Sequence, residues 1–436
     1  MDKKIIGKTF PNLNRTLAYY SPTSLYVTLN EITEEQLADF FTDNKNMNKV
    51  KNESIYIHEV RHNIDHFCTL WGQSNILKLS NAINARISNS ATEFYKIHPF
   101  KKEEYQFHYD EYYTVHYNQV KYNDANDTWA YRLSSGIKFD IKGKPDEKQP
   151  ILFMNFVNPK GMHVIRVPIS IAALLETNST FDEYQHITEY INSLPSAEKE
   201  IENKLFLNRS YRNMLYNQNM AVYNSVVHLT ANILGINNLM NALRISSAVA
   251  TLTLNLTKEL ISIIPINKLA KEKWKERTKY MIDNKEFGFI FFNLIANYSA
   301  EYKKDNLYNL EKLLSTNNLP KEEKCVEIIV KEIDNNKAEL SKLACLNESF
   351  QDICEIGKEV FHKRGLDGQK KSTKQLLIDN EFLPDVICSN TDFELEDYNL
   401  NQVIKNAPTK LPSQQRYSFT DFINQMLDEF YEIRGL

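Results

Sequence analysis

The segment from Ser54 to Asn89 constrains the fold more than any other, because it contains no proline and its only glycine is Gly72. Proline and glycine are the residues that most often end or bend a helix. We therefore predict one long helix over this segment, with a kink at the glycine. Before it, "SLYVTLN" predicts a strand, and the capping pattern "TEEQ" at Thr33 predicts the start of a short helix.

The texture of the sequence changes between about Tyr105 and Pro168, where aromatic and polar residues alternate. Such alternation predicts strands, and "ILFMNFVNPKGMHVIRVPI" predicts a hairpin around the turn residues "NPKG". We expect a small antiparallel sheet, inserted between helical pieces. After it, Ser170 should cap a helix "SIAALLETN", and the pattern "TFDE" at Thr180 predicts that a second helix starts there.

Everything after about Ser196 has the pattern of amphipathic or buried helices. The predicted fold class is therefore α+β and predominantly α-helical. We expect a first domain over residues 1–195, with its β insertion at about 105–168, and a helical domain of unassigned role over 196–436.

The composition excludes several classes of protein. The net charge is -4, from 52 basic and 56 acidic residues, so no basic surface for nucleic acid is expected over the whole chain. No window reaches the length of about 18 apolar residues that a membrane helix needs. Five scattered cysteines form no CxxC pair, which fits a reducing compartment. We expect a cytoplasmic protein that binds neither membrane nor nucleic acid.

One short motif carries recognisable chemistry: His58, Glu59 and His62 spell HExxH. On a helix, residues four apart are about 40° apart in projection, so both imidazoles can face one metal ion with the glutamate beside it. Since the chain has 10 histidines among 436 residues, we expect this motif by chance in only about one such chain in a hundred. The motif therefore favours a metal site.

At these residues the sequence resembles the zincin superfamily of metallopeptidases, in particular its gluzincin-like branch. The resemblance covers the motif helix, a small part of the chain. It implies that His58 and His62 are zinc ligands, and that Glu59 is the general base for hydrolysis of a peptide bond. In the metzincin pattern a third histidine would stand at Cys68, after a glycine that this chain lacks, so we expect this cysteine to be a small buried residue.

In the gluzincin branch the third ligand is a glutamate on a later helix, and Glu176 is our candidate. It is a lone carboxylate in the apolar segment "SIAALLETN", where a charged group needs a partner. An exposed position is the alternative. Glu183 lies seven residues further on, and we assign it to the capping box that starts at Thr180.

Four other residues are candidates for supporting roles. Asp65 lies one turn beyond His62 and is placed to orient an imidazole. His66 shares the face of the motif, although three ligands on one straight helix cannot surround an ion. His186 and His228 are candidates for stabilising a transition state, with a purely structural role as the alternative.

Two other interpretations stay open. Arg61 and His66 form an R-x4-H pattern that resembles HEPN-type ribonucleases, which would imply metal-independent RNA cleavage by these two side chains. Alternatively, the polar stripe belongs to a non-catalytic helical interaction protein with a degenerate site. As partners we expect a peptide or protein substrate, and a regulatory protein bound through the helical C-terminal half.

Overall fold

The computed structural model describes residues 16–42, 46–88, 92–107, 113–117, 128–139, 144–391, 409–410 and 416–433. The chain forms two compact units, each described separately below. The first contains Met1–Glu104, Val330–Gly365 and Lys370–Leu436, and the second contains Tyr105–Ile329 and Leu366–Gln369. This division differs from the predicted boundary near residue 195. The predicted class is confirmed: helices dominate, with two small sheets.

The first unit is built from helices around a three-stranded sheet. Its strands are β1 (Ala18–Tyr20), β2 (Tyr26–Leu29) and β7 (Asp385–Cys388), and its helices are α2 (Glu34–Ala38), α3 (Met47–Cys68), α4 (Leu70–Ser88), α17 (Asn347–Arg364), α18 (Thr373–Ile378) and α20 (Arg416–Ile433). The ends of α5 (Ile97–Phe107) and α16 (Glu322–Leu340) lie in different units. Strand β2 pairs antiparallel with β1 and parallel with β7. The predicted strand and the capping box at Thr33 are confirmed.

The predicted long helix is divided in two, and the break lies at Thr69 rather than at Gly72. Thr69 has an extended backbone (φ -90°, ψ 150°). Its hydroxyl donates to the Asp65 carbonyl at 2.6 Å and accepts from the Gly72 N–H at 3.1 Å, so one side chain serves both helix ends. The first helix also starts earlier than predicted, where Asn46 accepts from two backbone N–H groups.

Two glycines allow close packing at the corner between α3 and α4. A Cβ on Gly72 would lie 2.2 Å from the His66 carbonyl oxygen, and one on Gly357 would lie 1.8 Å from the Phe67 carbonyl oxygen. The Gln73 amide donates to the carbonyls of Phe67 and Cys354, at 2.9 and 3.1 Å. The end of α3 is therefore held by backbone contacts with α17.

Replacing Gly357 with alanine should lower the free energy of unfolding by about 2 kcal/mol, because the two helices must move apart to admit the methyl group. Urea unfolding measures the change. Gly235→Ala is the control: Gly235 has φ 76° with open space around it, so only backbone strain of about 1 kcal/mol is expected. Equal losses in the two variants would contradict the packing account.

The sheet of the second unit is antiparallel throughout. Its strands are β3 (Val115–His116), β4 (Ala130–Phe139), β5 (Pro145–Val157) and β6 (His163–Pro168), in the order β3-β6-β5-β4. The predicted β5–β6 hairpin is confirmed, and Asn158 stabilises its turn by accepting from the N–H groups of Lys160 and Met162. The predicted sheet begins too early, because Tyr105 lies in α5; residues 108–112 and 118–127 lie outside the described residues.

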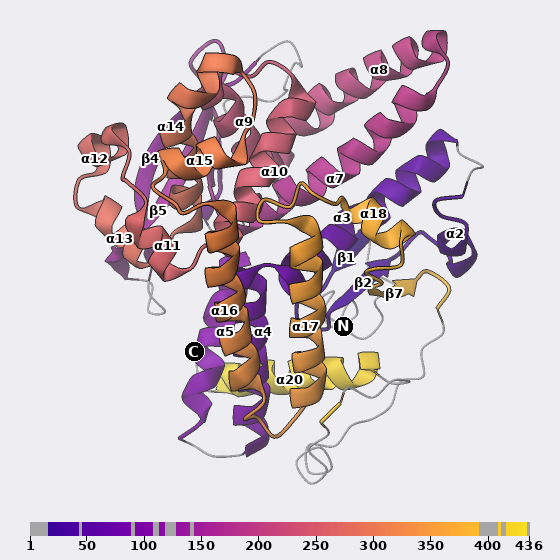
Figure 1. Ribbon diagram of the computed structural model, residues 1–436, viewed down its shortest axis with the longest axis vertical. Helices are drawn as coiled ribbons and strands as arrows, with labels where there is room; N and C mark the ends of the chain where they lie inside the picture. The colour runs from indigo at the N-terminus through magenta and orange to yellow at the C-terminus, as the bar shows by residue number, and fades with distance from the viewer. Residues whose placement is uncertain are drawn as a thin grey trace. The chain divides into compact units, whose positions relative to one another are not determined.

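The rest of the second unit is helical. Its remaining helices are α7 (Ile171–Ser193), α8 (Ser196–Ser210), α9 (Ala221–Leu234), α10 (Leu239–Asn255), α11 (Lys258–Ile263), α12 (Lys268–Trp274), α13 (Arg277–Asp283), α14 (Phe287–Asp305) and α15 (Leu310–Thr316). Of these, α9, α13 and α14 contact the sheet. A π-helical turn, η3 (Tyr211–Leu215), and a 3-10 turn, η4 (Gln218–Met220), precede α9. Figure 1 shows α7 and α8 as an antiparallel hairpin.

Helix α7 confirms one prediction and corrects another. Ser170 caps it, accepting from the Ala173 N–H at 3.2 Å. However, no second helix starts at Thr180, because α7 continues unbroken to Ser193 and the threonine is buried within it, 3% exposed. Without glycine or proline, nothing in the segment interrupts the helix. Glu183 therefore has no capping role.

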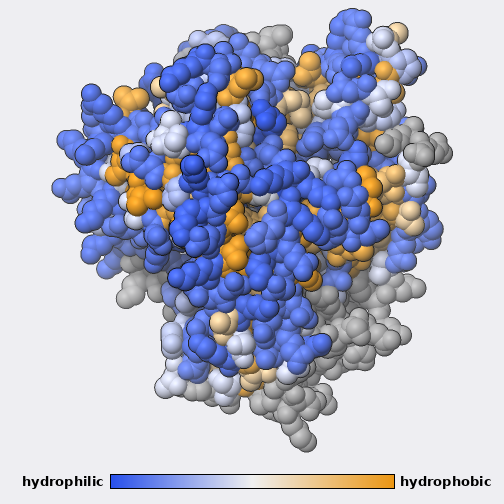
Figure 2. All heavy atoms as spheres, viewed as in Figure 1, coloured by the Kyte–Doolittle hydropathy of each residue, from blue (hydrophilic) through white to orange (hydrophobic). Residues whose placement is uncertain are grey.

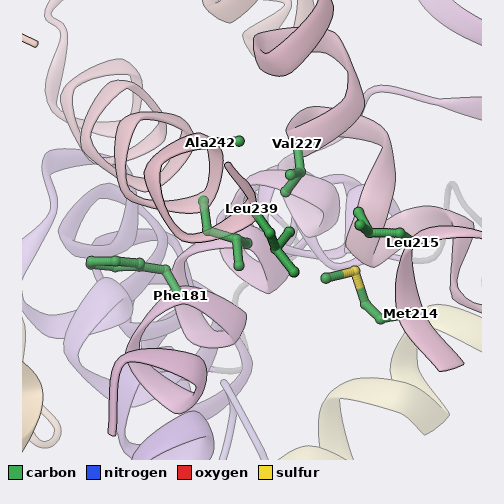
Figure 3. Close-up of a cluster of buried hydrophobic side chains, with 7 residues drawn as sticks. Phe181, Met214, Leu215, Val227, Leu239 and Ala242 are labelled. Atoms are coloured by element: carbon green, nitrogen blue, oxygen red, sulfur yellow. The ribbon is translucent and has the colours of Figure 1, made fainter. Parts of the chain in front are cut away.

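A hydrophobic cluster joins α7, η3, α9 and α10 (Figure 3). Its buried side chains are Phe181, Met214, Leu215, Val227, Leu239, Ala242 and Leu243. This core fixes the first half of α7, and with it the backbone that carries Glu176. The described helices include none that is both long and apolar enough to cross a membrane. All five cysteines are buried free thiols.

Glu286 gives the second unit a dependence of stability on pH. Its carboxylate caps α14, accepting from the Phe289 N–H at 2.6 Å. Burial raises its pKa from 4.5 to about 7, although the charge of Lys138 and the cap itself oppose the shift. The folded state therefore binds a proton that the unfolded state has lost, and stability falls as pH rises from 4.5 to about 7.

In Glu286→Gln this loss should disappear. Between pH 4.5 and 7.5 the stability of the variant should rise by about 3 kcal/mol relative to the natural chain. Urea unfolding at a series of pH values measures the difference. The control is Glu276→Gln, at an exposed residue that makes no capping bond. A parallel pH profile for the natural chain and Glu286→Gln would contradict the assignment.

Candidate metal centre

Helix α3 presents the two motif histidines side by side. The ring centroids of His58 and His62 are 5.0 Å apart, with the ring planes at 74°. This follows from their separation of one helical turn, which places both imidazoles on the same side of the helix. Glu59 follows His58 directly, so the carboxylate is carried by the same turn.

Exposure separates the motif from its surroundings. Between Tyr56 and Gln73 every residue is buried except His58, Glu59 and His62, which are half-buried. The remaining faces of the helix are occupied by the packing of the protein. The helix therefore reaches accessible surface at the three residues of HExxH, and a partly dry position of this kind strengthens electrostatic interactions with a bound ion or substrate.

Asp65, which was predicted to orient an imidazole, forms an ion pair with Arg61. The guanidinium Nε and the carboxylate Oδ1 are 3.0 Å apart, and each side chain is 1% exposed. Both residues lie on α3, four positions apart, in an ion pair sealed from solvent. The two charges on the polar face of α3 therefore neutralise each other next to the motif.

His66 belongs to the buried part of the helix and not to its accessible part. Its Nδ1 donates to the His62 carbonyl at 3.1 Å, and its ring packs against Tyr20 and Trp71, with centroids at 5.1 and 4.8 Å. Burial lowers its pKa to about 3, so the imidazole is neutral. A ribonuclease needs this histidine and Arg61 at a surface that RNA can reach, and their burial counts against that interpretation.

The other predicted residues lie in the second unit, except for Cys68. Glu176 is half-buried on α7, and His186 is buried on the same helix. On α9, the His228 Nε2 donates to the Leu215 carbonyl at 2.8 Å. This bond gives His228 a structural role, which was the alternative to stabilising a transition state. Cys68 is buried as predicted, 4% exposed, and burial raises the pKa of its thiol.

An aromatic cluster surrounds His228. Trp129, Phe156 and Tyr216 lie with ring centroids 6.3, 5.1 and 5.5 Å from the imidazole. Burial lowers the pKa of this histidine, and the bond to the π-helical turn fixes its orientation. The ring therefore helps to hold η3 against α9.

Sequence patterns missed the residues that support the end of the motif helix. Gln73 and Gly357 hold the last turn of α3, and only the contacts of the folded chain reveal them. The local sequence signal for this corner is "WGQ" after the motif. Gly72 permits the close approach to α3, and Gln73 bonds the carbonyls of Phe67 and Cys354.

Comparisons of the chain with protein-family models, with curated proteins and with solved structures find no match.

Proposed function

We propose that the protein is a zinc-dependent peptidase, in which His58 and His62 bind the metal and Glu59 is the general base. The observation that carries the proposal is the exposure pattern of α3. In an otherwise buried stretch, the three half-buried residues are the three whose chemistry a zinc hydrolase requires.

Glu176 is proposed as the third ligand. Two imidazoles and one carboxylate form a donor set that catalytic zinc uses, and they leave a fourth position open. The two imidazoles of the first unit lie side by side, with ring centroids 5.0 Å apart, which supports the histidine pair. Glu176 is half-buried on α7 of the second unit. The half-burial of these residues also fits a site that a substrate must reach.

The chain's own groups would perform the proton transfers. When bound, zinc supplies a Lewis acid for the peptide carbonyl and acidifies water. Glu59 accepts a proton from the attacking water and donates it to the leaving amine, which a half-buried carboxylate next to the ligands is placed to do. The substrate class is a peptide or an exposed segment of a protein.

Metal analysis of purified protein tests the proposal. The natural chain should carry about one zinc ion, and His58→Ala and His62→Ala should each retain less than about a tenth of it. His362→Ala, at an exposed histidine of α17, is the matched control and should keep the metal. Full zinc content in both motif variants would contradict the proposal.

The third ligand has a separate test. Glu176→Ala should weaken zinc binding by at least about a hundredfold, measured by competition with a chelator, because one of three protein ligands is removed. Glu183→Ala, on the same helix, is the control and should leave the affinity unchanged. Equal zinc affinities in the two variants would show that Glu176 is not a ligand, and would leave the assignment of His58 and His62 unchanged.

A further inference from the structure

Strand β4 has an outer edge that is bound by side chains. In the part of the chain that the structure describes, β4 pairs with β5 on one side and with no strand on the other. On that outer side, Lys273 Nζ donates to the Leu133 carbonyl at 2.6 Å, and Arg277 Nη1 donates to the Ser135 carbonyl at 3.0 Å. Two outward carbonyls of the strand therefore accept from long cationic side chains.

The spacing of these two carbonyls is that of a strand-pairing site. Leu133 and Ser135 are two residues apart, so their backbone groups point to the same side at a separation of roughly 6.8 Å. Alternate N–H groups of an added antiparallel strand repeat at the same distance. The side chains of Lys273 and Arg277 therefore occupy the positions that an incoming strand would use.

Displacing the two cations breaks few contacts. Each has one hydrogen bond to a carbonyl, Arg277 also contacts the Ser135 hydroxyl at 3.5 Å, and Lys273 lies 5.5 Å from the Trp274 ring centroid. Both side chains are exposed, and a lysine or arginine fixed in one rotamer gives up much conformational freedom. Their helices are held firmly, because Trp274 between them is buried against Phe289 and Phe292 at 6.0 and 5.6 Å. Displacement would thus move two side chains and leave α12 and α13 in place.

The charge around this edge indicates the character of the partner. The segment 267–284, which contains α12 and α13, has six lysine or arginine residues and three acidic ones. Leu269 on α12 is 72% exposed. Figure 2 shows hydrophobic surface among hydrophilic residues over this region, at the left of the view. A partner with carboxylates would meet cations, and an apolar side chain would find an apolar contact.

We propose that the outer edge of β4 binds an acidic, extended segment of a partner protein, which adds to the sheet as a strand. The carboxylates of the segment pair with Lys273 and Arg277 after its backbone has replaced them on the carbonyls. A second copy of this chain fits less well, because two such edges would bring four cations together. This inference is independent of the proposed peptidase activity.

A labelled twelve-residue peptide, three repeats of Glu-Thr-Glu-Val, is the probe, and fluorescence anisotropy measures its binding to the full chain. Lys273→Glu/Arg277→Glu should weaken binding at least about tenfold. The matched control, Lys268→Glu/Lys279→Glu, reverses two exposed charges of the same helices and should stay within about twofold of the natural chain. No binding of the probe, or equal losses in both double variants, would overturn the proposal.

The backbone part of the proposal needs its own measurement. The same peptide with N-methyl groups at alternate residues loses one set of N–H donors and should bind at least about tenfold more weakly. Hydrogen exchange at residues 131–137 should slow when the unmodified peptide is bound. Equal affinity of the two peptides, or unchanged exchange on binding, would each show that no acidic strand adds here.

Discussion

Glu59→Gln should lower the rate of peptide hydrolysis by about a thousandfold, while the zinc content stays at one ion per chain. Glutamine has nearly the shape of glutamate but cannot accept the proton of the attacking water. The two ligand histidines are untouched by the change. The rate is measured as kcat/KM on a quenched fluorescent peptide that the natural chain cleaves, and the metal is measured in the same sample.

The combination of the two readouts identifies the role of Glu59. The control is Glu189→Gln, at an exposed glutamate of α7, which should change neither quantity. If Glu59→Gln cleaved peptide at the natural rate, the glutamate would not be the base. If the zinc were lost with the activity, the glutamate would act on the metal site and not on the proton.

Removing the Asp65 carboxylate should produce the largest loss of stability. Asp65→Ala breaks a buried ion pair with the Arg61 guanidinium, which is 1% exposed, and breaking such a pair costs about 4 kcal/mol of unfolding free energy. Urea unfolding followed by circular dichroism measures the change. The double variant Arg61→Met/Asp65→Leu should recover most of the loss, because apolar side chains of similar volume replace the whole ion pair.

An exposed pair provides the control for this prediction. Glu200→Ala breaks the ion pair with Lys204, whose side chains are 70% and 76% exposed, and should cost less than about 1 kcal/mol. A loss in Asp65→Ala no larger than that would contradict the buried-pair account. If the Arg61→Ala variant kept full stability and lost an RNA cleavage that the natural chain performs, the ribonuclease interpretation would be favoured instead.

Local patterns predicted the features that local chemistry determines. The capping box at Thr33, the cap at Ser170 and the hairpin around Asn158 each depend on a few neighbouring side chains and backbone groups. The side-by-side arrangement of His58 and His62 follows from helical geometry alone. These features could be predicted because no distant part of the chain is needed to form them.

Other features depend on contacts that the sequence does not display. The corner after α3 is held by the bond from Gln73 to the carbonyl of Cys354, a residue 281 positions away. Gly72 alone therefore predicted the helix break at the wrong residue, since the break lies at Thr69. At Thr180 a capping pattern lies inside a continuous helix, because tertiary burial of α7 outweighs the local preference. The pairing of Asp65 with Arg61 likewise follows from burial of their shared face.

The most direct test of the central claim is X-ray absorption at the zinc edge of the purified protein. The account predicts two imidazole nitrogens at about 2.0–2.1 Å and otherwise oxygen ligands, with one imidazole lost in His62→Ala. Sulfur ligands at about 2.3 Å, or a spectrum that is the same in His58→Ala and His62→Ala as in the natural chain, would contradict a metal centre at HExxH.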